Sequence, residues 1–429
     1  MSFGFEPDEA YAEKLAWVDE FVRTEIEPVD RVIEHAWDVN DPIRNRLIRP
    51  LQEIVRKEEM WACHLGPELG GPGYGQLKLA LLNERLGRTH SGPVVFGCHA
   101  PDSGNAEILA HYGTPELKSR YLEPLIENEI VSCYSMTEPQ GGSDPTAFVT
   151  RAERDGDEWV INGLKWFSSH ARFASFYIVM AVTDPDATRH QRASMFVVPA
   201  DTPGIEIVRN VGVWGHDEEE GTHAFVRYTD VRIPADHLLG DRGQGFAVAQ
   251  TRLGGGRIHH AMRTVGLVKE SLDMMLDRAV SRRSGTGTLA DRQLVQEMIA
   301  DSYIQLEQFR LLVLQTAAKI DHYNDYRKVI IDISAVKAAM PKVLLDVVGR
   351  AIQVHGSLGI STEMPFGKWA MESYHMALAD GATELHKIQV AKQLLKGREP
   401  YEGLFPPRHL PALEAEARER FADVLSLDA

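Results

Sequence analysis

A block of short strand-like segments lies between two helix-like regions, and this order restricts the fold more than any other feature of the chain. Between about residues 131 and 238, short apolar and β-branched runs are separated by turn-forming residues. Before and after this block, apolar residues recur at the three- or four-residue spacing of amphipathic helices. The sequence therefore predicts an α+β chain in which an all-β part separates two helical parts.

The periodic runs set the expected elements. In the N-terminal part we expect helices over residues 8–27, 44–60, 76–90 and 103–112. In the β part, Asp155-Gly156 separates two strand-like runs and predicts a hairpin turn. In the C-terminal part, four long helical runs suggest a bundle, and they cover residues 265–283, 289–322, 326–355 and 367–396. The expected domains are residues 1–130, 131–240 and 241–400, with a proline-containing tail over 401–429.

Charge and cysteine content argue against several classes of function. The 429 residues include 46 basic and 62 acidic side chains, a formal net charge of −16, whereas nucleic-acid binding needs a basic surface. No apolar run is long enough for a membrane span. The three cysteines, Cys63, Cys98 and Cys133, form no C-x-x-C pair, so neither a disulfide framework nor a metal site is expected. The acidic start MSFGFEPDEA shows no leader pattern, and we expect cytoplasmic residence.

Four segments break the regular periodicity and carry groups suited to ligand binding. Residues 133–146 gather glycines and hydroxyls at a turn, and residues 162–170 place two aromatic rings beside two serines, which suits a flat heterocycle. Residues 351–361 form a glycine-rich helix end, which is typical of phosphate sites and of simple C-caps alike. Asp380-Gly381 interrupts a helical run, so the carboxylate could project into a cavity. Each segment also has an ordinary structural interpretation, and none is specific alone.

Two adjacent histidines, His259 and His260, follow Arg257 in a helical run. Adjacent side chains on a helix point about 100° apart, so the pair is a poor metal site. We expect at least one of them to have a structural or solvent-facing role.

In combination these segments resemble the acyl-CoA dehydrogenase family of flavoproteins, over about residues 8–397. The matching motifs, in the family's order and spacing, are YSMTEPQGGSD (134–144), DEWVINGLKWFSS (157–169), RLGGGR (252–257), QVHGSLGIS (353–361) and ADGATELHK (379–387). The resemblance implies a helical N-terminal domain, a middle β-barrel or sandwich and a C-terminal four-helix bundle. RIHHAMR (257–263) and ADGATELH further resemble the subgroup in which Asp replaces the usual catalytic Glu.

The resemblance implies that FAD lies between the β part and the C-terminal helices. The positions that match its contacts are Tyr134, Met136, Thr137, Gly142, Ser143, Phe167, Ser168, Ser169, Arg282, Gln293, Gln353, Val354, His355, Gly356, Ser357, Ala382, Thr383 and Glu384. The positions that match substrate contacts are Ser143, Arg257 and Gly381. Because Arg282, Gln293 and the turn at 353–357 match groups that act across a subunit contact, the resemblance also implies a homodimer or homotetramer.

The same resemblance implies the reaction. Asp380 takes the α-proton of a saturated acyl-CoA while the β-hydride passes to flavin N5, which gives a trans-2-enoyl thioester. The backbone N–H of Asp380 and a flavin ribityl hydroxyl stabilise the enolate oxygen, and an electron-transferring flavoprotein accepts the electrons. Gly256 stands where some family members carry the base on an earlier helix, so Asp380 is the one carboxylate that we nominate. Gly285 stands where the family usually has Phe, in the segment that meets the adenine.

Two other functions are consistent with these residues. One is a flavin oxidase of the same fold, similar to nitroalkane oxidases, which also use an Asp base and reoxidise with oxygen. The other is a non-catalytic protein that binds FAD or acyl-CoA. Neither the chain length, branching or hydroxylation of the acyl group nor the choice between coenzyme A and a carrier protein follows from the sequence.

Overall fold

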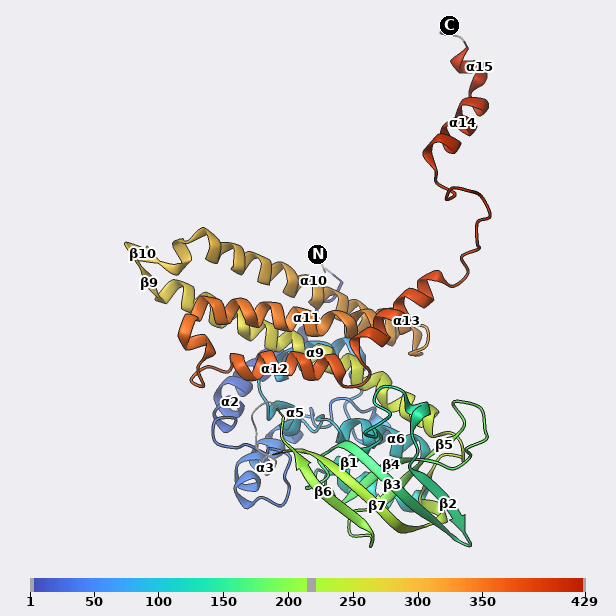
Figure 1. The fold of residues 1–429 in the computed structure, drawn as a ribbon. Coiled ribbons are helices and arrows are strands. Elements are labelled where there is room, and N and C mark those ends of the chain that lie inside the picture. Colours follow the sequence, from blue (N-terminus) through green and yellow to red (C-terminus); the bar gives the residue numbers. More distant parts are fainter. Residues whose placement is uncertain (1–3, 214–220, 427–429) are drawn as a thin grey trace. The chain divides into compact units, whose positions relative to one another are not determined.

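The computed structural model of the chain describes residues 4–213 and 221–426. Two compact units can be distinguished, Met1–Lys387 and Ile388–Ala429. The first unit contains the helical, β and helical parts in the predicted order (Figure 1).

The N-terminal part is helical, as predicted. Its α-helices are α1 (Glu9–Phe21), α2 (Glu27–Val29), α3 (Pro42–Lys57), α4 (Gly75–Leu86), α5 (Gly92–Val95), α6 (Asp102–Tyr112), α7 (Pro115–Leu117) and α8 (Glu123–Ile126). Asp8 and Asp41 cap α1 and α3, because each side chain accepts a hydrogen bond from a first-turn N–H. A π-helical turn, Val22–Ile26, continues α1 into α2, so the periodic run at 8–27 is one nearly continuous helical segment.

The middle part is an eight-stranded sheet. Its strands are β1 (Ser132–Ser135), β2 (Arg151–Asp155), β3 (Glu158–Ser169), β4 (Phe176–Val182), β5 (Ala193–Pro199), β6 (Ile205–Val211), β7 (His223–Pro234) and β8 (Leu238–Leu239). Their order is β6-β7-β3-β1-β4-β5-β8, and β2 pairs with β3 and β4. The pairings of β4 with β1 and β2 are parallel, and the others are antiparallel. Every residue of β4 is buried, so this strand is covered on both faces.

The predicted hairpin turn is displaced by one residue. Asp155 is the last residue of β2 and pairs with Glu158, so Gly156 and Asp157 form the turn, rather than Asp155 and Gly156. Gly156 has a φ of +60°, which suits the first central position of a tight hairpin turn.

The C-terminal part contains α9 (Gly245–Ser281), α10 (Gln293–Tyr323), α11 (Ile330–His355), α12 (Phe366–Leu378) and α13 (Thr383–Leu395). Helices α9 to α12 lie side by side in the first unit (Figure 1). One expectation was wrong in detail. Helix α9 begins at Gly245, well before the periodic run at 265, because its first half contains three consecutive glycines that interrupt the apolar pattern. The predicted interruption at Asp380-Gly381 divides the run at 367–396 into two helices.

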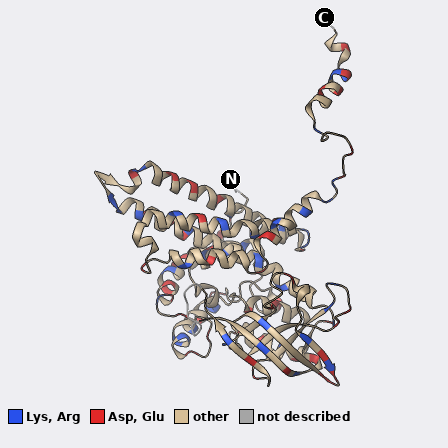
Figure 2. Cartoon of the chain, in the orientation of Figure 1, with Lys and Arg blue, Asp and Glu red and all other residues tan. Residues whose placement is uncertain are grey.

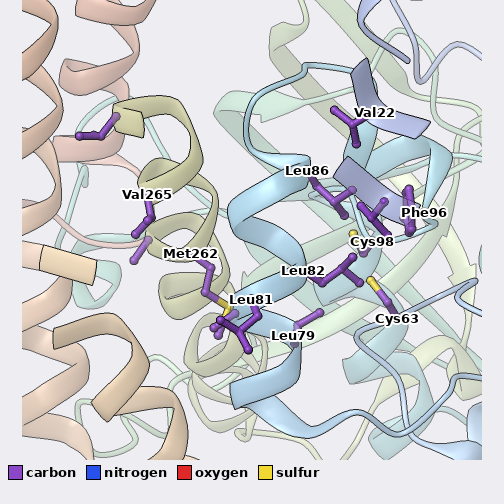
Figure 3. Close-up of a cluster of buried hydrophobic side chains, with 14 of the residues drawn as sticks. Val22, Cys63, Leu79, Leu81, Leu82, Leu86, Phe96, Cys98, Met262 and Val265 are labelled. Carbon is purple, nitrogen blue, oxygen red and sulfur yellow. The ribbon is translucent and has the colours of Figure 1, made fainter. Parts of the chain in front are cut away.

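Helix α4 connects the N-terminal helices to α9. In Figure 3, Leu81 of α4 lies near Met262 of α9, while Leu82 and Leu86 lie toward Cys98 on the other side. All five side chains are buried. This packing fixes the position of α9, the helix against which the candidate site is built.

Acidic and basic residues are interspersed along the helices and strands (Figure 2). Among the described residues no helix is long and apolar enough to cross a membrane. Cys63, Cys98 and Cys133 are free and buried. In the described ranges no group of three or more His, Cys, Asp or Glu side chains is arranged to hold a metal ion.

The second unit is small and its side chains are mostly exposed. It contains the end of α13, a segment with Pro400, Pro406 and Pro407, and two helices, α14 (Leu410–Arg420) and α15 (Ala422–Leu425). The short charged helix expected in the tail is α14.

Candidate active site

Asp380 occupies the break between α12 and α13. Its φ is +54° and that of Gly381 is +102°, so both residues have a left-handed backbone conformation, which interrupts the helix. The main-chain oxygen of Asp380 accepts hydrogen bonds from Arg257 Nε (3.0 Å) and His386 Nε2 (3.3 Å). These bonds fix the backbone at the helix break. They involve only the main-chain oxygen, and the carboxylate points toward the middle of α9.

The carboxylate of Asp380 lies against a glycine of α9. A Cβ atom placed on Gly256 would be only 3.1 Å from Asp380 Oδ2. Any side chain at position 256 would therefore push the carboxylate away from the helix. The Asp380 side chain is 14% exposed, so it is largely removed from water.

Basic side chains surround this carboxylate. Asp380 Oδ2 is 3.4 Å from His260 Nε2, and Oδ1 is 3.9 Å from Arg252 Nη1. Burial raises the pKa of Asp380, but the interactions with the neighbouring basic groups His260, Arg252, Arg257 and Lys337 outweigh it, and the pKa is lowered below its ordinary value. At neutral pH the carboxylate is therefore ionised, which is the form a base requires.

Arg252 links three elements at this site. Its guanidinium lies 3.8 Å from the centre of the Tyr134 ring, and its Nε donates to Asn105 Oδ1 at 2.9 Å. Asn105 in turn donates to Ser132 of β1. Arg252 thus ties α6 and β1 to the part of α9 that faces Asp380. Sequence reasoning did not nominate Arg252, although it opens the RLGGGR motif.

The two adjacent histidines have different roles. His259 Nε2 lies 3.2 Å from Gln76 Oε1 of α4, which is a structural contact between helices. His260 faces Asp380. The expectation that at least one histidine is structural agrees with this placement, but sequence reasoning did not identify His260 as a neighbour of the base.

A second carboxylate lies beside the same stretch of α9. A Cβ placed on Gly255 would be 3.4 Å from Glu107 Oε2 and 3.6 Å from the Tyr326 hydroxyl oxygen. Within the described part of the chain no hydrogen bond or ion pair involves the Glu107 side chain. Burial raises the pKa of Glu107 to about 7, and the charge of Arg252 opposes this shift only in part. In the sequence, Glu107 is one residue of a periodic helical run, so the pattern does not indicate that it is a candidate site residue.

Glu107→Gln is expected to stabilise the protein more at pH 8 than at pH 5. The folded pKa of about 7 is above the ordinary value of 4.5, so the folded state holds the proton more tightly. The stability of the wild-type protein therefore falls as the pH rises from about 4.5 to 7, by up to about 3 kcal/mol. Urea unfolding at both pH values measures the difference. Glu116→Gln, on the exposed side of α7, is the control, and an equal gain for Glu107→Gln at both pH values would refute the explanation.

The β part brings several predicted cofactor residues together at the end of β3. Tyr134 pairs with Ser169 across β1 and β3. Phe167 has a φ of +56°, is 37% exposed and stacks on His223 at 4.7 Å, and the Ser169 hydroxyl lies 2.9 Å from His223 Nδ1. The left-handed backbone turns the Phe167 ring out of the strand, where a flat ligand can stack on it. The Ser168 hydroxyl is fully buried and bonded to Ser135, so its side chain faces the sheet interior.

A buried ion pair supports the glycine-containing loop of the first motif. Lys165 Nζ of β3 lies 2.8 Å from Glu138 Oε1, and it also donates to the main-chain oxygen of Met136. The Thr137 oxygen accepts from the N–H of Trp166, which joins the loop to β3. Beyond these anchored residues, Gly142 and Ser143 are exposed at the tip of the loop.

Another set of predicted residues lies at the far end of α9. A Cβ on Gly356 would be 3.8 Å from Arg282 Nη1, so the structure brings Arg282 and the turn at 353–357 together. Gln353, Gly356 and Ser357 are exposed, as is Gln293 at the start of α10. The side chains of Val354 and His355 are buried, and His355 Nδ1 lies 2.7 Å from the Ala351 oxygen.

The remaining predicted residues directly follow the base. Ala382 and Thr383 are half-buried, and Glu384 is exposed in the first turn of α13. The Thr383 hydroxyl donates to the Ala377 oxygen at 3.2 Å and so bridges the helix break.

Comparison with known proteins gives the class of the molecule. Residues 9–129, 133–230 and 243–395 match the N-terminal, middle and C-terminal domains of acyl-CoA dehydrogenases. The chain therefore belongs to the acyl-CoA dehydrogenase family. FAD is its cofactor. The predicted family, fold class and cofactor are confirmed, and the Asp-base subgroup stays a prediction.

Individual relatives agree with this assignment. "Acyl-CoA dehydrogenase family member 11" of Gallus gallus is 37% identical over 390 residues, which cover 89% of this chain and 50% of the relative. The chain thus spans about half the length of that protein. "Probable acyl-CoA dehydrogenase FadE2" of Mycobacterium tuberculosis is 39% identical over 351 residues, which cover 81% of this chain and 85% of the relative. A solved structure of an acyl-CoA dehydrogenase homologue from Mycobacterium abscessus is 38% identical, with a TM-score of 0.84 and coverage of 91% and 99%.

The residues on both sides of the site fit FAD. The exposed ring of Phe167, the Ser169 hydroxyl and the turn after Asp380 offer a stacking surface and polar edges of the kind that an isoalloxazine requires. The exposed turn at Gly356 beside the Arg282 guanidinium offers a cation of the kind that a pyrophosphate requires.

Proposed function

We propose that the protein dehydrogenates a saturated acyl-CoA to the trans-2-enoyl thioester, with Asp380 as the base that removes the α-proton. One observation carries this proposal: an ionised, largely buried carboxylate is held at a helix break and presented to the glycine face of α9. When bound, FAD supplies the hydride acceptor. The protein supplies the base and the position of the substrate.

The α-proton of a thioester is a weak acid, so the site must also stabilise the negative charge that develops on the carbonyl oxygen. The backbone N–H of Asp380 makes no hydrogen bond within the described residues, although the oxygen of the same residue is bonded twice. This N–H is thus available to the thioester oxygen. Because it belongs to the base residue, one short segment of the chain would orient both the carbonyl and the α-carbon.

A cleft at the start of α9 supports coenzyme A as the thiol carrier. Its volume is about 630 Å³, and its lining residues include His190, Arg242 and Phe246. The His190 and Phe246 rings lie 4.4 Å apart, and Arg189 and Arg192 contact the neighbouring loop at Asp144 and Thr146. Aromatic rings with nearby guanidinium groups suit an adenine nucleotide.

The distance from this cleft to the base also suits coenzyme A. Phe246 and Gly256 are ten residues apart on α9, about 15 Å at 1.5 Å per residue. The pantetheine arm of coenzyme A separates its thiol from its nucleotide and can extend along this stretch of the helix. The exposed Ser143 loop then borders the substrate entrance.

The two groups of predicted FAD residues lie too far apart for one cofactor within one chain. Gly256, beside the base, and Arg282 are 26 residues apart on α9, about 39 Å, which exceeds the length of an extended FAD molecule. We therefore infer a homodimer or dimer of dimers in which Arg282, Gln293 and the 353–357 turn of one copy complete the site of another. Exposed apolar side chains on α9 and α10, among them Leu276, Val280 and Ile304, are consistent with such a contact.

An anaerobic titration of the purified FAD-loaded protein with a panel of saturated acyl-CoAs tests the proposal. We expect one substrate class to bleach the visible flavin absorbance, sedimentation to show a dimer or larger assembly, and an electron-transferring flavoprotein to restore the absorbance. Bound flavin that no acyl-CoA bleaches would refute the proposed reaction. Rapid reoxidation by oxygen alone would instead favour the oxidase interpretation.

A further inference from the structure

His260 is the imidazole that faces the carboxylate of Asp380. It lies four residues after Gly256 and therefore on the same face of α9. Its Nε2 is 3.4 Å from Asp380 Oδ2, within reach of a hydrogen bond after a small adjustment, and its side chain is 20% exposed. His260 thus has one edge at the base and another toward solvent.

A buried base must be returned to its ionised form after each reaction. Once Asp380 has taken the α-proton, it must release that proton before the next turnover, yet substrate or product covers it. Arg252, Arg257 and Lys337, which also surround Asp380, are proton donors when charged, and Lys337 Nζ already donates to the Met376 oxygen. His386 is bonded to the main-chain oxygen of Asp380. A neutral His260, in contrast, can accept a proton at Nε2.

We propose that His260 is a positioning residue that acts through Asp380, taking the captured proton from its carboxyl group and passing it toward solvent. This inference rests on the proposed function. In the first step the Asp380 O–H bond breaks and a His260 N–H bond forms, which regenerates the carboxylate and leaves an imidazolium. In the second step the imidazolium gives the proton to water or to the histidine–carboxylate pair of His375 and Glu372 on α12, and His260 is neutral again.

The electrostatics favour an easy exchange between the two groups. Burial lowers the pKa of His260 to about 4, and the charge of Asp380 opposes this shift only in part. The pKa of Asp380 is also below its ordinary value of 3.8, so neither group holds the proton strongly. At neutral pH the imidazolium then loses its proton readily, which keeps Asp380 ready as a base.

A further histidine–carboxylate pair continues from this point. His375 Nδ1 lies 3.4 Å from Glu372 Oε2 on α12. The charges of Asp380, Arg263, His375 and Lys337 act on the pKa of His260. His375, His260 and His90, which is exposed, act on the pKa of Glu372. Among the described residues, the titratable groups around His260 therefore come from α9, α11, α12 and the helix break.

Exchange of the substrate α-hydrogen with solvent tests the role of His260. The holoenzyme is incubated anaerobically with a saturated acyl-CoA in D2O without an electron acceptor, and mass spectrometry measures the deuterium at the α-carbon of recovered substrate. Stopped-flow absorbance measures flavin bleaching in parallel. For His260→Ala we expect the ratio of exchange to bleaching to fall at least tenfold, and added imidazole to restore it. His259→Ala, which removes the adjacent imidazole on another face of α9, is the matched control and should keep the wild-type ratio.

Two results would overturn the inference while leaving the proposed function intact. One is a wild-type ratio in His260→Ala with normal bleaching, and the other is a lower ratio that imidazole does not restore although circular dichroism shows a folded protein. A wild-type protein that neither bleaches nor exchanges with any acyl-CoA would refute the proposed function itself, and the inference with it.

Discussion

Asp380→Asn is expected to bind FAD normally and to lose between about 10²- and 10⁴-fold in the rate of flavin bleaching by acyl-CoA. The amide is nearly the same size as the carboxylate, and the bonds from Arg257 and His386 go to the main-chain oxygen, so the helix break should keep its geometry. The amide cannot accept the α-proton. Flavin content from the absorbance spectrum and the single-turnover bleaching rate separate binding from chemistry.

Asp380→Glu is the companion variant. Glutamate restores a base, but its extra methylene must fit where Asp380 Oδ2 already lies 3.1 Å from the position of a Cβ on Gly256. We expect bleaching at a rate between those of the wild-type protein and Asp380→Asn. Wild-type bleaching in Asp380→Asn would remove Asp380 as the base and direct attention to Glu107, the other carboxylate beside the glycine stretch.

Lys165→Met is expected to lower the free energy of unfolding by about 3 to 5 kcal/mol, because it leaves the charge of Glu138 buried without its partner. Lys165 is 0% and Glu138 is 1% exposed in their side chains, and Nζ and Oε1 are 2.8 Å apart. Glu138 also accepts from the N–H groups of Val149 and Thr150. Because this pair anchors the loop at 136–150, the variant should also bind less FAD.

Urea unfolding of three variants makes this test specific. The double variant Lys165→Met/Glu138→Gln should recover part of the loss, since no unpaired charge remains. Arg232→Met removes two largely exposed ion pairs of β7, with Glu158 of β3 and Asp155 of β2, each at 2.9 Å, and should cost at most about 1 kcal/mol. Equal losses for Lys165→Met and Arg232→Met would contradict the assigned importance of burial.

Much of the candidate site could be located from the sequence, because its key positions interrupt a regular pattern. Asp380-Gly381 breaks a helical run, and the structure indeed ends α12 and starts α13 around it. Phe167 and Ser169 lie at the end of β3, where the Phe167 ring is exposed and the Ser169 hydroxyl meets His223. The three glycines of the RLGGGR motif indicate that other groups approach this part of the helix closely. Helical periodicity alone does not show this.

The groups that periodicity could not assign are those whose role depends on a neighbour far away in the chain. Glu107 is an ordinary residue of α6 until Gly255 brings α9 near it. His259 and His260 are equivalent in the sequence, but one contacts Gln76 and the other Asp380. Ser168 and Ser169 are adjacent hydroxyls, and strand alternation places one against Ser135 in the buried interior and the other against His223 on the opposite face.

The sequence by itself determined the order of helical and β parts, the family and its cofactor, and the nomination of Asp380, because local periodicity and short motifs carry this information. Only the tertiary structure decided what surrounds the base: Arg252, His260 and Lys337 meet one carboxylate from two helices, and Arg282 meets the Gly356 turn at the opposite end of α9. These contacts join residues up to 128 positions apart, from Arg252 to Asp380. Such contacts depend on how closely packed helices approach, and a residue's own neighbours in the chain do not specify that distance.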